Sequence, residues 1–115
     1  MNLQGFYNAI GGNLEEAKSR LMNETLVLKF VKKFITTGDY ELLVKSYQND
    51  DKPEVYRAVH TLKGMSLNMA FTNFANMCTE FCEKYKAQNF SSYNTDVKVL
   101  CDEYLKIKKL IEELE

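Results

Sequence analysis

The fold class of this chain is decided by residues 71–85, FTNFANMCTEFCEKY. Large apolar side chains recur in this stretch at alternating spacings of three and four residues. They are Phe71, Phe74, Cys78, Phe81 and Tyr85. This spacing places them on one stripe of an α-helix, the stripe that packs against other helices. The stretch therefore predicts a helix that contributes to a helical core.

The C-terminal part of the chain repeats this pattern from about Thr95. Its apolar side chains are again three or four residues apart, at Val97, Leu100, Tyr104, Ile107, Ile111 and Leu114. The polar stretch 89–94 between the two patterns is typical of a turn. We therefore expect two long amphipathic helices joined by a short connection.

Glycine and asparagine mark the first helix boundaries. Gly11 and Gly12 end a short apolar helix over residues 3–10, because glycine readily adopts the positive φ found at helix ends. Asn13 then has the character of an N-cap, and Glu16 three residues later completes a box-like start. A second helix is expected from this point.

Residues 13–37 are predicted to form either one helix or two, because Asn23 is a second candidate cap within them. Gly38 ends this region. Asp39 is expected to cap a helix that extends to about Gln48.

The next helix is expected to start where Asp51 precedes Pro53 and Glu54, since proline suits the first helical turn and acids suit its dipole. We assign one face of this helix to the core, namely Val55, Val59, Leu62, Ser66 and Met69. His60 falls about 140° from the centre of that face, at 100° per residue. The only histidine of the chain should therefore face solvent.

Composition agrees with an all-α protein. The 115 residues include only one proline and five glycines, too few for a loop-rich or all-β chain, and 45% are hydrophobic. Several amphipathic helices joined by short turns can bury their apolar faces together in an antiparallel up-and-down four-helix bundle, which is the architecture we expect. We expect a single domain over residues 1–115, with an N-terminal helical extension over 1–22 and the bundle over about 23–114.

Charge and hydropathy exclude several classes of function. A net charge of −1 gives no basis for binding nucleic acid or an anionic membrane surface. No segment has the length and character of a transmembrane span or a signal peptide. No phosphate-binding GxxxxGK loop or Gly-rich kinase loop occurs, so ATP binding is not expected. We expect a cytoplasmic monomer that is not an enzyme.

The three cysteines, Cys78, Cys82 and Cys101, suit a reducing compartment better than a disulfide framework. Cys78 and Cys82 would share a helix face, as two metal ligands could. No second histidine and no CxxC motif supports such a site. We interpret them as buried structural thiols and expect no metal or cofactor.

The residues after His60 suggest a reason for its exposure. Lys63 and Gly64 follow at the spacing at which helix side chains meet. Glycine inside a helix costs on the order of 1 kcal/mol relative to alanine, and its lack of bulk would let another group approach the imidazole. Lys63 could neutralise phosphate oxygens, and a neutral imidazole has one ring nitrogen free to act as a nucleophile. An exposed histidine beside a tolerated glycine is the plainer alternative.

The stretch Arg57-Ala58-Val59-His60-Thr61-Leu62-Lys63-Gly64, followed by Asn68, resembles the signature of histidine-containing phosphotransfer (Hpt) domains of bacterial two-component phosphorelays. The resemblance implies a helical bundle in which His60 exchanges a phosphoryl group with the aspartate of a receiver domain. It gives Lys63 a phosphate-stabilising role, Gly64 the role of leaving access, and Asn68 a structural or hydrogen-bonding role. Ala70 stands where many members have glycine, which leaves the turn after this helix undefined.

The implied partners are response-regulator receiver domains and a hybrid or sensor histidine kinase, and the implied Mg²⁺ belongs to the receiver. Tyr56, Leu67 and Asn68 are expected to contact these partners around His60, although Tyr56 and Leu67 could instead flank the core and be partly buried. One alternative function is the phosphoacceptor domain of a chemotaxis-type histidine kinase. Another is a helical adaptor that binds partners without phosphorylation.

Overall fold

The protein is all-helical. The computed structural model describes all residues 1–115 and contains seven α-helices, one 3₁₀ turn and no strand. The elements are α1 (Leu3–Ile10), α2 (Leu14–Leu21), α3 (Glu24–Lys33), the 3₁₀ turn η1 (Phe34–Thr36), α4 (Asp39–Gln48), α5 (Lys52–Asn68), α6 (Thr72–Lys86) and α7 (Tyr93–Glu112). None of these helices combines the length and the apolar character needed to cross a membrane.

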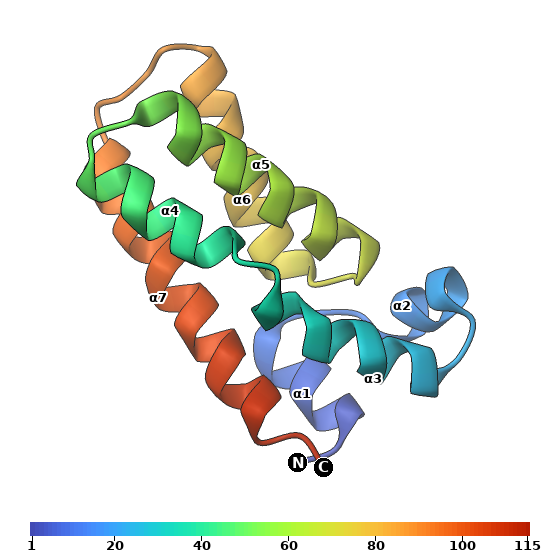
Figure 1. The fold of residues 1–115 in the computed structure, drawn as a ribbon. Coiled ribbons are helices and arrows are strands. Elements are labelled where there is room, and N and C mark those ends of the chain that lie inside the picture. Colours follow the sequence, from blue (N-terminus) through green and yellow to red (C-terminus); the bar gives the residue numbers. More distant parts are fainter.

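The predicted antiparallel four-helix bundle is formed by α4, α5, α6 and α7 (Figure 1). Each of these helices packs on its neighbours in a closed ring, with α5 diagonally opposite α7. The long helix α7 continues beyond the N-terminal end of α4 and there also contacts α1 and α3. The two chain ends meet there, where the Met1 amino group donates a hydrogen bond to the Glu113 carbonyl at 3.2 Å.

Most helix boundaries follow the capping residues expected from the sequence. Gly11 ends α1 in the left-handed conformation with φ of 68°. The side chains of Asn13 and Asn23 accept hydrogen bonds from backbone N–H groups at the starts of α2 and α3. Of the two possibilities for residues 13–37, one helix or two, the structure shows two: α2 and α3 are separate helices joined at Met22 and Asn23. The division of the chain at residue 22 into extension and bundle stays a prediction.

Two predicted boundaries are wrong in detail. Asp39 does not cap α4, because Gly38 occupies the cap position with φ of 83° and Asp39 is the first helical residue. The Asp39 carboxylate instead accepts a hydrogen bond from the Thr37 hydroxyl at 2.6 Å. The last helix begins at Tyr93 and not at Thr95, because the Tyr93 ring is buried against aromatic neighbours and extends the core stripe by one turn.

A single core runs through the whole molecule. It consists of 26 buried residues contributed by every α-helix from α1 to α7, and it includes both predicted stripes apart from their half-buried ends, Tyr85 and Leu114. The N-terminal helix is part of this core, since Phe6 and Tyr7 contact Phe71 edge to face, at centroid distances of 5.7 Å. The Tyr7 hydroxyl also donates a buried hydrogen bond to the Met69 carbonyl at 2.8 Å. These contacts fasten α1 to the turn that follows α5.

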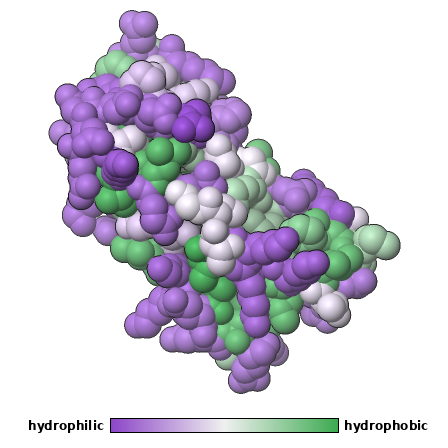
Figure 2. Space-filling model, viewed as in Figure 1, coloured by the Kyte–Doolittle hydropathy of each residue, from purple (hydrophilic) through white to green (hydrophobic).

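The surface is mainly hydrophilic on the face seen in Figure 2, and hydrophobic side chains show in several patches, one of them over the end of the molecule formed by α2 and α3. Met22, which joins these two helices, is 81% exposed, and Phe30 on α3 is 37% exposed. Isolated exposed apolar side chains of this kind are common on protein surfaces.

Candidate functional site

The only histidine lies on the outward face of α5. This helix starts at the cap Asp51, whose side chain accepts a hydrogen bond from the Glu54 N–H at 3.3 Å. The face assigned to the core is buried, as predicted: Val55, Val59, Leu62, Ser66 and Met69. His60 is exposed, also as predicted from the helical period.

Lys63 is a cation without an ion-pair partner in this chain. It lies one turn after His60, is partly exposed, and is close enough to α6 for its charge to act on Cys78 and Cys82. Its charge reaches the thiols of α6: burial raises the pKa of Cys82, and the nearby ammonium group of Lys63 opposes that shift. Lys63 therefore places an unpaired positive charge one turn from His60.

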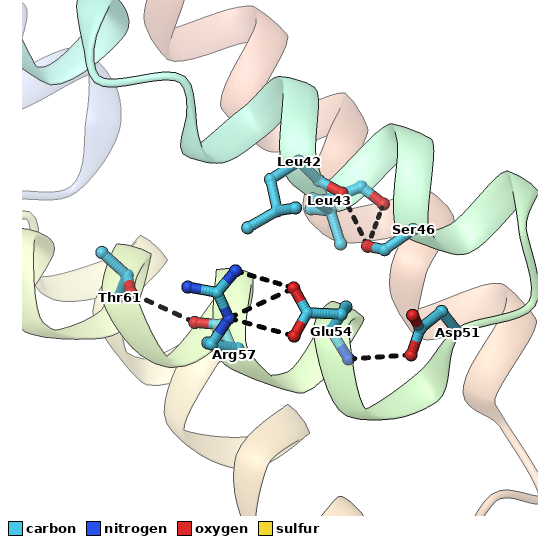
Figure 3. A network of polar contacts seen from close by, with 7 residues as sticks. All are labelled: Leu42, Leu43, Ser46, Asp51, Glu54, Arg57 and Thr61. Carbon is cyan, nitrogen blue, oxygen red and sulfur yellow. Dashed lines mark hydrogen bonds and ion pairs between the residues drawn. The ribbon is translucent and has the colours of Figure 1, made fainter.

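Arg57, one turn before His60, is occupied by an ion pair. Its Nη2 atom donates to Glu54 Oε2 at 2.7 Å and its Nε atom donates to the same carboxylate at 3.2 Å (Figure 3). These hydrogen bonds lower the pKa of Glu54 and raise the pKa of Arg57. The Arg57 carbonyl accepts a further hydrogen bond from the Thr61 hydroxyl at 3.1 Å. Of the two cations next to His60 on α5, Lys63 alone has no partner.

Gly64 leaves the surface beside His60 empty. A Cβ atom added at this position would have no atom within 4 Å apart from its own helix and chain neighbours. Side chains on an α-helix lean toward its N-terminus, so a side chain at position 64 would lean toward His60 one turn earlier. Packing within the chain does not require glycine here, and a side chain at this position would occupy the space beside His60.

The three expected partner contacts differ in exposure. Tyr56 is half-buried, and its ring centroid lies 5.7 Å from that of His60. Leu67 is 47% exposed on the same side of the helix. Asn68 is exposed, and its side chain makes no hydrogen bond within the chain, so the hydrogen bond expected there is not formed internally.

The turn after α5 is built around Ala70. This residue has φ of 57°, in the left-handed region that usually favours glycine, and its side chain is buried. Its carbonyl accepts a hydrogen bond from the Asn13 N–H at 2.9 Å, and its N–H donates to the Leu67 carbonyl at 3.2 Å. The turn left undefined by the sequence is thus a left-handed one held by hydrogen bonds.

Sequence reasoning missed two residues near the site. Arg20 on α2 donates a hydrogen bond to the Leu67 carbonyl, and its guanidinium is also paired with Glu16. Tyr85 on α6 stacks on Tyr56, with ring centroids 4.4 Å apart. Tyr85 had been assigned to a core stripe by its spacing, and no signal in the sequence indicated which residue of α5 it would meet.

Cys78 and Cys82 are buried, free thiols, and burial raises the pKa of both. The chain contains no group of three or more His, Cys, Asp or Glu side chains arranged to hold a metal ion, at these two thiols or elsewhere. The structural interpretation of these two thiols agrees with their burial.

The family model of the Hpt domain matches residues 13–115, which is nearly the whole chain. The chain is an Hpt domain. Hpt domains take part in two-component phosphorelays by transferring phosphoryl groups on histidine, and this Hpt domain contains one histidine. No curated protein and no solved structure matches the chain.

Proposed function

We propose that this Hpt domain is a phosphocarrier in which His60 exchanges a phosphoryl group with an aspartate of receiver domains. The observation that supports the proposal best is the position of His60. The only imidazole of the chain is exposed on α5, beside an unpaired Lys63 and the open space at Gly64. A nucleophile that must meet the active site of another protein has to be accessible from outside.

In the proposed reaction a neutral nitrogen of His60 attacks the phosphorus of an aspartyl phosphate in line. The P–N bond forms as the P–O bond to the aspartate breaks, and the carboxylate leaves with the electron pair; the reverse reaction returns the phosphoryl group. Transfers of this kind depend mostly on alignment and charge stabilisation. Lys63 would compensate the phosphoryl charge, and Mg²⁺ would be bound by the receiver, so this chain needs no cofactor of its own.

Partner contact is proposed around His60, through Tyr56, Leu67 and Asn68. An exposed leucine, a half-buried aromatic ring and a free cation along the outer side of α5 suit a transient interface with an acidic site. The phosphoryl donor upstream would be a hybrid or sensor histidine kinase acting through its receiver. We further propose that the carrier works as a monomer in the cytoplasm, where three free thiols would remain reduced.

The proposal is tested by incubating the chain with a phosphorylated receiver domain and, separately, with an active hybrid kinase. We expect an acid-labile, base-stable phosphate on the chain that is absent from His60→Gln, while the far-UV circular dichroism of the variant is unchanged because His60 is exposed. Label that persists in His60→Gln, or no label from several competent donors, would overturn the carrier function. The second outcome would favour the helical adaptor.

The chemotaxis-type alternative is separated by the identity of the donor. A kinase catalytic domain mixed with the chain and ATP, with no receiver present, would label His60 directly if the chain were the phosphoacceptor domain of such a kinase. A phosphocarrier is labelled only when a receiver aspartate supplies the phosphoryl group.

A further inference from the structure

A row of aromatic rings leads from His60 across α5 to α6. The Tyr56 ring lies 5.7 Å from the imidazole, centroid to centroid. Tyr85, in the last turns of α6, stacks on Tyr56 at 4.4 Å between centroids, with the ring planes 24° apart. Phe90, in the turn after α6, then meets the Tyr85 ring edge to face at 5.8 Å.

Helix geometry sets the direction in which His60 can lean. Side chains on α5 point back toward its N-terminus, so the imidazole lies over the turn that contains Tyr56, four residues earlier. On this side the ring of Tyr56 is its aromatic neighbour, with the ring planes 38° apart. On the other side, at Gly64, no side chain limits it. The orientation of the nucleophile therefore depends on how firmly Tyr56 is held.

Tyr56 is held from a different helix. It is only half-buried, so core packing does not surround its ring, whereas the face of Tyr85 covers it directly. Tyr85 is itself half-buried, unlike Phe74, Cys78 and Phe81 of the same stripe, which are buried. Its main aromatic contacts are with Tyr56 and Phe90 and not with the centre of the core.

We infer that Tyr85 is a positioning residue for the phosphoacceptor: by stacking on Tyr56 it restricts the orientations of the His60 imidazole and leaves the ring open on the Gly64 side. The inference rests on the proposed function for its effect on phosphoryl transfer, but the orientation of His60 can be measured without any transfer. The ring of Tyr85 matters here and its hydroxyl does not, because stacking uses the ring face.

The first test is the NMR spectrum of the His60 ring protons in the unphosphorylated chain. Tyr85→Ala should change their chemical shifts and Tyr85→Phe should leave them as in the wild type, because ring currents report the neighbouring aromatic rings. A matched control is Tyr40→Ala, which removes the half-buried partner of an equally close stack, Tyr40 on Tyr104 at 4.4 Å, between α4 and α7. Unchanged His60 shifts in Tyr85→Ala, or equal changes in the control, would overturn the inference.

The second test is the rate of transfer from a phosphorylated receiver present at saturating concentration. We expect Tyr85→Ala to lower this rate by about tenfold, because misorientation of a reacting group is costly even when its partner is bound. Tyr85→Phe and Tyr40→Ala should transfer at the wild-type rate. A wild-type rate in Tyr85→Ala would contradict the positioning role.

The two tests separate the inference from the proposed function. If the wild-type chain accepts no phosphoryl group, the carrier function fails, and the ring-proton shifts alone decide whether Tyr85 orients His60. If Tyr85→Ala does not fold, Tyr85→Leu keeps apolar bulk at the contact without a stacking face, and it should show the same shift changes and the same loss of rate.

Discussion

Gly64 on the outward face of α5 and Ala70 in the turn after it form a contrasting pair, because each has the backbone conformation that suits the other residue. Gly64 is helical, where alanine would be more stable by about 1 kcal/mol. Ala70 is left-handed, with φ of 57°, where an L-residue with a side chain is strained by about 1–2 kcal/mol. Both positions are thus locally unfavourable.

The surroundings of the two residues explain the difference. The side chain of Ala70 is buried in the core, and its backbone is fixed by hydrogen bonds to Asn13 and Leu67, so packing offsets the strain of its conformation. Gly64 has nothing around it that a methyl group would touch. The contrast teaches that contacts within the fold account for alanine at position 70, whereas no contact within the chain accounts for glycine at position 64. We propose that glycine is used there because a receiver domain must approach His60.

The largest effect is expected from filling the space at position 64. Gly64→Leu should fold normally, because its Cβ atom would meet no neighbour and the rest of the side chain can lie over the exposed surface of α5. It should nevertheless lower transfer from a phosphorylated receiver by about 100-fold, because the side chain leans toward His60 and displaces the partner. Transfer kinetics and circular dichroism measure the two results. Thr95→Leu, on the exposed side of α7, is the control and should transfer normally. Normal transfer by Gly64→Leu would remove the functional explanation of this glycine.

Gly12→Ala tests the packed side of the comparison. A Cβ atom at Gly12 would lie 2.8 Å from the Ala70 carbonyl oxygen and 2.8 Å from Cδ2 of Tyr7. Neither the backbone oxygen nor the buried ring can move easily, so we expect the free energy of unfolding to fall by about 2 kcal/mol. Urea denaturation measures this change. A free energy of unfolding equal to that of the wild type would mean that the turn at Ala70 can shift to accommodate the added methyl group and is not held rigidly by its hydrogen bonds.

The same substitution at the open position should have the opposite sign. Gly64→Ala is expected to raise the free energy of unfolding by about 1 kcal/mol, since alanine favours the helix and meets no atom. Urea denaturation alongside Gly12→Ala makes the two variants controls for each other. A loss of stability in Gly64→Ala would indicate that glycine is needed for the fold of α5 itself.

The smallest effect is expected at Ala70. In Ala70→Gly the relief of about 1–2 kcal/mol of left-handed strain is offset by two losses. The buried methyl group contributes about 0.8 kcal/mol, and the greater freedom of glycine in the unfolded chain costs about 0.7 kcal/mol. The free energy of unfolding should therefore stay within about 0.5 kcal/mol of the wild type by urea denaturation. A gain well above this value would show that packing does not offset the strain.

Much of the fold could be predicted from the sequence because local patterns determine it. The spacing of apolar residues identified the bundle helices. The helical period alone placed His60 on the outside, away from the buried face that contains Val59 and Leu62. Capping side chains located the starts of α2 and α5. Asp39 was assigned wrongly because Gly38 can occupy the cap position without any side-chain hydrogen bond, which a preference for acidic caps does not anticipate.

Contacts between helices could not be predicted in the same way. The stack of Tyr85 on Tyr56 depends on how α6 is rotated and shifted against α5. The left-handed turn at Ala70 depends on a hydrogen bond from Asn13, which is far away in the sequence. The freedom of Lys63 from ion pairing is also a property of the whole surface, since it requires that no carboxylate of any helix comes near.

The hydrogen bond from Tyr7 to the Met69 carbonyl implies that the limits of the family and the limits of the folding unit differ. The match to the Hpt family begins at residue 13. The aromatic rings of α1, which precedes this range, nevertheless pack on Phe71 and hold the turn between α5 and α6. A chain trimmed to the family boundary would expose Phe71 to water and would lose the hydrogen bond that holds the C-terminal end of the helix carrying the histidine. Helix α1 therefore supports the fold of the Hpt domain although it lies outside the range that the family model matches.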